Sequence, residues 1–66
     1  MRIQLNGGEH ETSQGVTLRS LLETMSLPAA RVAVELNGRV VARDDFERIE
    51  IREGDVLEVV HFVGGG

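Results

Sequence analysis

Two Asn-Gly dipeptides, at 6–7 and 37–38, each follow a segment of alternating apolar and polar residues. Asn-Gly between two extended segments is the strongest short-range indication of a β-hairpin, because the tight turn needs positive φ at both central residues. The clearer case is RVAVELNGRVVA at 31–42, and MRIQLN at 1–6 leads into the other. The return segment at 9–12 is mostly polar and is expected at a sheet edge. The sequence therefore predicts two antiparallel hairpins.

One helix is predicted between the hairpins. Its apolar residues repeat at i, i+3, i+4 and i+7, which forms one stripe facing a core; they are Leu18, Leu21, Leu22 and Met25. Thr17 is a natural N-cap, because its hydroxyl can accept a hydrogen bond from a free backbone N–H in the first turn. Pro28 prevents much extension beyond Leu27.

The rest of the chain adds one more strand. Residues 43–47 are expected to form a turn or a single helical turn with Phe46 beneath it, and a further turn is expected at Gly54-Asp55. The last strand runs through 56–63. Helices do not alternate with the strands, so the fold class is α+β, a mostly antiparallel sheet of four to five strands with one helix on one face. We expect a domain at 1–63 and a flexible glycine tail at 64–66.

The faces of the last strand can be assigned from Glu58. An unpaired carboxylate is too costly to bury, so Glu58 is expected to face water. Alternation then exposes Val60 and Phe62 as well. Single exposed apolar residues are common, but their place directly before the tail also suggests a patch for docking a partner. The candidate docking residues are Val60, Phe62 and Val63.

Composition excludes several function classes. Sixty-six residues make one domain, and eleven acidic against seven basic residues give a net charge of −4, which opposes binding to nucleic acid. Cysteine is absent, and no acid–base pair, nucleophile or metal set is visible, so an enzyme with its own active site is the least favoured class. No run approaches the roughly 20 apolar residues of a membrane span. No leader is visible, so a cytoplasmic location is expected.

The chain ends in Gly64, Gly65 and Gly66. Three extended residues reach about 10 Å, and without Cβ atoms they could enter a channel too narrow for other residues. The terminal carboxylate could then be activated as an acyl adenylate and attacked by a nucleophile. Tail residues can also be glycine because nothing constrains them, and both interpretations remain open on the tail alone.

The stretch REGDVLEVVHFVGGG, with the strand–helix order and the Asn-Gly hairpin, resembles the ThiS family of sulfur carrier proteins in thiamin thiazole biosynthesis. The resemblance implies a ubiquitin-like β-grasp with its first and last strands paired in parallel at the centre of the sheet. It implies that an E1-like adenylating enzyme activates Gly66 with ATP. Sulfur from a cysteine desulfurase or another persulfide source would then give a thiocarboxylate for thiazole synthase. Gly64 and Gly65 would lie in the partners' channels, and the chain itself would bind no cofactor.

Other functions remain open. The small subunit of molybdopterin synthase shares the fold, the diglycine end and the thiocarboxylate chemistry, although that family tends to have prolines before the tail, where this chain has VVHFV. A ubiquitin-like interaction module would use the same body without terminal chemistry. A conjugating modifier is a further alternative.

Overall fold

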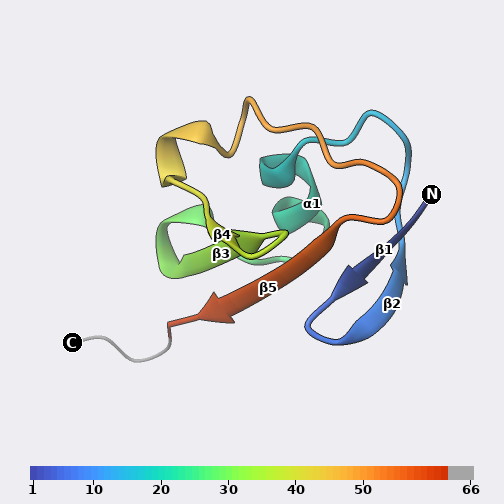
Figure 1. The fold of residues 1–66 in the computed structure, drawn as a ribbon. Helices are drawn as coiled ribbons and strands as arrows, with labels where there is room; N and C mark the ends of the chain where they lie inside the picture. The colour runs from blue at the N-terminus through green and yellow to red at the C-terminus, as the bar shows by residue number, and fades with distance from the viewer. Residues whose placement is uncertain (63–66) are drawn as a thin grey trace.

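The computed structural model describes residues 1–62. Within them a five-stranded sheet has the order β2-β1-β5-β3-β4, and one α-helix packs against it (Figure 1). The strands are β1 (Arg2–Leu5), β2 (Gly8–Glu11), β3 (Val32–Leu36), β4 (Arg39–Val40) and β5 (Val56–His61). β1 and β5 run parallel at the centre, and the other neighbours are antiparallel. The α+β class and the parallel central pair are confirmed.

Both predicted hairpins are present. Asn6 and Gly7 have φ of 50° and 83°, and Asn37 and Gly38 have φ of 52° and 85°, as a two-residue turn with positive φ at both central positions requires. β4 covers only the first two residues of the expected return segment 39–42. Ala42 instead precedes a 3₁₀ helix, so the chain turns away from the sheet there.

The helix α1 (Leu18–Thr24) begins where the sequence predicts. The hydroxyl oxygen of Thr17 accepts a hydrogen bond from the backbone N–H of Ser20 at 3.1 Å. The helix ends before Pro28 is reached, because Ser26 adopts a φ of 59°. The backbone N–H groups of Ser26 and Leu27 then donate to the carbonyls of Glu23 and Leu22, which is the Schellman pattern of helix termination.

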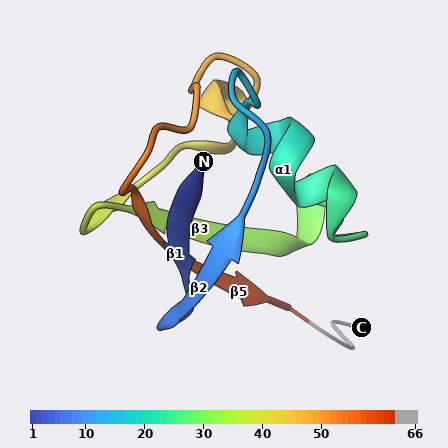
Figure 2. The ribbon, with the colours of Figure 1, turned by 90° about the vertical axis from the view of Figure 1, so that its right-hand side faces the viewer.

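The core lies between the sheet and the segments that cover one of its faces. Figure 2 shows α1 and the 41–55 segment on the same side of the sheet. The 3₁₀ helix η1 (Ala29–Arg31) lies in the connection from α1 to β3, and η2 (Arg43–Asp45) lies in the connection from β4 to β5. Phe46, directly after η2, is buried as expected. The buried side chains are Ile3, Leu18, Leu21, Leu22, Val32, Val34, Phe46, Ile51, Leu57 and Val59. Among residues 1–62, no helix has the length and apolar character that crossing a membrane requires.

Candidate functional site

The strand that leads to the glycine tail is the central strand of the sheet. β5 pairs with β3 from Leu57 to His61, and the backbone N–H of Phe62 still donates to the Arg31 carbonyl at 2.8 Å. On its other side β5 pairs with β1 only at Val56 and Leu57. The last described residue is therefore still held on the β3 side. Val63, Gly64, Gly65 and Gly66 lie outside the described residues.

Asn6 extends the shorter pairing by means of its side chain. Its Oδ1 accepts from the Val59 N–H at 2.7 Å, and its Nδ2 donates to the Val59 carbonyl at 3.2 Å. The amide thus occupies the place that the next residue of a longer β1 would take. Asn37, which follows β3 on the other side of β5, also bonds to the β5 backbone: its Oδ1 accepts from the Val56 N–H at 2.9 Å. The sequence identified both residues only as turn formers. Their residue type was a clue, because asparagine is the common turn residue whose side-chain amide can both donate and accept hydrogen bonds.

The predicted faces of β5 are confirmed. Leu57 and Val59 point into the core, whereas Glu58 is exposed and Val60 and Phe62 are 57% and 53% exposed. Two of the three predicted docking residues therefore lie on the sheet face that α1 does not cover. Whether they dock a partner stays a prediction.

The uncovered face contains further residues that the sequence did not single out. Across the strands Ala33 faces Val60, Glu35 faces Glu58, and Val40 faces Glu35. Val40 is 79% exposed. These five residues line a shallow hollow of about 110 Å³ together with Val34. We call Ala33, Glu35, Val40, Glu58 and Val60 the open-face patch. It could have been found by extending the register of the second hairpin onto β5.

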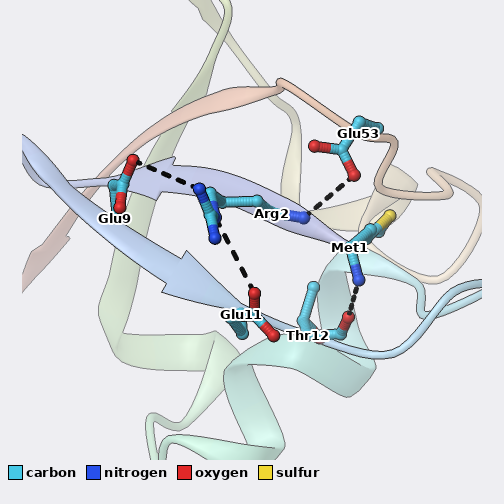
Figure 3. Close-up of polar contacts among 6 residues, drawn as sticks. All are labelled: Met1, Arg2, Glu9, Glu11, Thr12 and Glu53. Carbon is cyan, nitrogen blue, oxygen red and sulfur yellow. Dashed lines mark hydrogen bonds and ion pairs between the residues drawn. The ribbon is translucent and has the colours of Figure 1, made fainter.

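Polar contacts elsewhere hold neighbouring segments together. Figure 3 shows Arg2 between Glu9 and Glu11 of β2, at 3.9 and 3.7 Å, while its backbone N–H donates to Glu53 at 3.0 Å. The Met1 ammonium donates to the Thr12 carbonyl at 2.8 Å. These contacts join β1 to β2 and to the turn before β5, so we assign them to the fold.

A larger hollow of about 570 Å³ lies beside η2 and is lined by three arginines among other residues. Arg19 is paired with Glu23 and Glu47, and Arg43 donates to the carbonyls of Ala29 and Val32 at 2.9 and 3.4 Å. Two of the three cations are thus engaged in contacts within the chain. Residues 1–62 contain no group of three or more His, Asp or Glu side chains suited to holding a metal ion.

Comparison with known proteins now identifies the family. The ThiS family model matches residues 3–66. The chain belongs to the ThiS family. The sulfur carrier protein ThiS of Bacillus subtilis is 35% identical over 65 residues, which are 97% of this chain and 98% of that protein. The crystal structure of the thiamine biosynthesis protein ThiS from Geobacter metallireducens superposes with a TM-score of 0.85 at 32% identity over the whole of both chains. The ubiquitin-like β-grasp expected for a ThiS member is confirmed.

Two further relatives are much longer than this chain. A thiazole synthase of Magnetococcus marinus is 44% identical over 66 residues, and one of Paramagnetospirillum magneticum is 35% identical over 66. The chain spans about a fifth of the length of each of these two relatives, 20% in both cases. A ThiS-like stretch therefore occurs within proteins that carry the name thiazole synthase.

Proposed function

We propose that this chain is a sulfur carrier of thiamin biosynthesis and that the Gly66 carboxylate carries the sulfur. In this scheme an E1-like enzyme adenylates Gly66 with ATP and releases pyrophosphate. A persulfide sulfur, from a cysteine desulfurase or another source, displaces AMP. Cleavage of the resulting S–S bond by a thiol leaves a thiocarboxylate, which thiazole synthase uses in thiazole formation. The observation that carries the proposal is the match to the ThiS family through the last glycine.

The described part of the chain fits the role of a protein co-substrate. β5 is bonded on both sides, so the residues after it start from a fixed position. Beyond it, Gly64 and Gly65 would lie extended in the active-site channels of the partners, where the lack of Cβ atoms avoids steric conflict. The partners supply ATP binding and the catalytic groups. We place this chemistry in the cytoplasm.

The thiazole synthase relatives support one of the proposed partners. Their ThiS-like stretch is joined covalently to a much longer remainder. A carrier and the enzyme that consumes its sulfur gain effective concentration when they are linked in one chain. We therefore favour thiazole synthase as the acceptor over the large subunit of molybdopterin synthase.

Intact-mass measurement tests the proposal. We expect incubation with the E1-like enzyme, Mg-ATP, a persulfide-charged cysteine desulfurase and a thiol reductant, which cleaves the S–S bond, to add the mass difference between one sulfur and one oxygen atom. A variant lacking Gly66 should not be modified, because its carboxylate falls short by about 3.5 Å. As a positive control, the E1-like enzyme is shown to modify the carrier protein from its own source. If that control succeeds and the mass of the wild-type chain stays unchanged, the proposal is contradicted.

The choice of pathway is tested separately with the sulfurated chain. We expect sulfur to be consumed when thiazole synthase and its substrates are supplied, and to stay on the chain with the large molybdopterin synthase subunit. The reverse result would replace thiamin with molybdopterin biosynthesis while leaving the carrier chemistry intact.

A further inference from the structure

Two carboxylates lie side by side on the open face of the sheet. Glu35 on β3 and Glu58 on β5 are directly opposite in the antiparallel register. Two residues along, the Asn37 N–H donates to the Val56 carbonyl at 2.7 Å, which makes Glu35–Glu58 a pair of the hydrogen-bonded type. The Cα atoms of such pairs are about 5.5 Å apart. Both side chains are exposed and project from the same face.

This arrangement is unfavourable in the isolated domain. Like charges directly opposite each other on antiparallel strands lower stability. Within the described part of the chain, every ion pair is made by Arg2 or Arg19, and neither contacts Glu35 or Glu58. A cation placed between the two carboxylates would therefore relieve a repulsion that the fold leaves in place.

The surroundings of the pair are apolar. Val40 lies opposite Glu35 on the neighbouring strand. Ala33 and Val60 form the next cross-strand pair on the same face of the sheet. All of these residues line the hollow of about 110 Å³. An apolar rim around two carboxylates suits arginine, whose aliphatic stem packs on apolar surface. Its planar fork of N–H donors can serve two carboxylates, whereas lysine offers a compact point charge. Arginine is also enriched in protein interfaces, where lysine is depleted.

We propose that the open-face patch is a receptor for an arginine of the protein that adenylates the chain, with the guanidinium held between Glu35 and Glu58. The identity of that partner rests on the proposed function, whereas the recognition chemistry is derived from the sheet itself. The patch adjoins Phe62 through Val60, next to the start of the tail. Docking here would fix the body of the chain while the tail occupies the active site of the partner.

Charge-neutral variants test the proposal. We expect Glu35→Gln with Glu58→Gln to raise the KM for this chain in ATP–pyrophosphate exchange by about tenfold, or about 1.4 kcal/mol, with kcat unchanged. Calorimetric binding without ATP should weaken by a similar factor. The thermal midpoint of the double variant should stay equal or rise, because a repulsion is removed. The double variant Asp44→Asn with Glu50→Gln is the matched control, since it also removes two negative charges. Both residues are exposed in the 41–55 segment on the helix side of the sheet and belong to no ion pair among residues 1–62.

The outcomes separate the two proposals. If the wild-type chain is adenylated and the Glu35→Gln, Glu58→Gln variant behaves like the two-charge control, the arginine receptor is wrong and the carrier function stands. An equal loss in all variants would show that net charge, and not this pair, matters, and would overturn the receptor. A loss confined to binding of thiazole synthase would overturn the assignment to the adenylating partner. If the wild-type chain is not adenylated at all, the proposed function itself fails.

Discussion

Asn6 and Asn37 each satisfy two requirements with one residue. Both hairpin turns need positive φ, which asparagine tolerates better than most residues. Both side chains then bond to the backbone of β5, at Val59 and Val56 respectively. Glycine would satisfy the turn alone. The two residues thus connect hairpin formation directly to the strand that precedes the tail.

The glycine variant of Asn6 isolates the second requirement. Asn6→Gly keeps the turn but leaves the Val59 N–H and carbonyl without their amide partner, so we expect the free energy of unfolding to fall by about 1–3 kcal/mol. Urea denaturation measures this change. Ser26→Gly is the matched control, because Ser26 also has positive φ, is exposed and makes no side-chain hydrogen bond within residues 1–62. Equal stability of the two variants would show that the amide contributes nothing beyond the turn.

At the scale of elements, short sequence patterns predicted the features that depend only on residues close together in the chain. Asn-Gly specified both hairpins, apolar spacing specified α1, and Glu58 specified the faces of β5. The parallel pairing of β1 with β5 came only from the family resemblance, because strands about fifty residues apart leave no trace of their pairing in either segment. The shortness of β4 was missed since it depends on where the chain turns into η2.

The residues of the candidate site also fall into those that one strand alone predicts and those that depend on pairing between strands. Val60 and Phe62 were predicted from alternation along one strand, whereas Val40 and the Glu35–Glu58 pair depend on register between strands. The roles of Val63 and of the three glycines rest on residues outside those described. They stay predictions, which the mass and transfer experiments address.

The two phenylalanines of the chain provide a test of these elements. Phe62 is 53% exposed at the end of β5, and Phe46 is 2% exposed beneath η2. We expect Phe62→Ala to change the free energy of unfolding by about 1 kcal/mol or less while weakening binding to the adenylating enzyme that we propose as a partner. Phe46→Ala should cost about 3–5 kcal/mol. A large loss of stability in Phe62→Ala with unchanged binding would make Phe62 a structural residue and remove it from the docking surface.

At the scale of the whole molecule, segments far apart in the sequence contribute side chains to one small core. Ile3 on β1, Leu21 on α1, Val34 on β3 and Phe46 in the long connection belong to the same buried cluster. A domain of this length derives only about 3–5 kcal/mol of stability from its core. The loss of one large side chain is therefore comparable to the whole stability, and no hairpin is expected to persist alone.

Graded truncation of Ile3 tests this single-core organisation. Ile3→Val should cost about 0.5–1.5 kcal/mol and leave the chain folded, whereas Ile3→Ala should cost about 2–5 kcal/mol, comparable to the whole stability, and populate the unfolded state at 25 °C. Because small domains unfold as one unit, the amide NMR signals of the distant β3–β4 hairpin should lose dispersion together with those of β1. Val40→Ala, at a 79% exposed position, should leave the spectrum folded. A folded β3–β4 hairpin together with an unfolded β1 in Ile3→Ala would show that the two halves are stable separately and would contradict the single core.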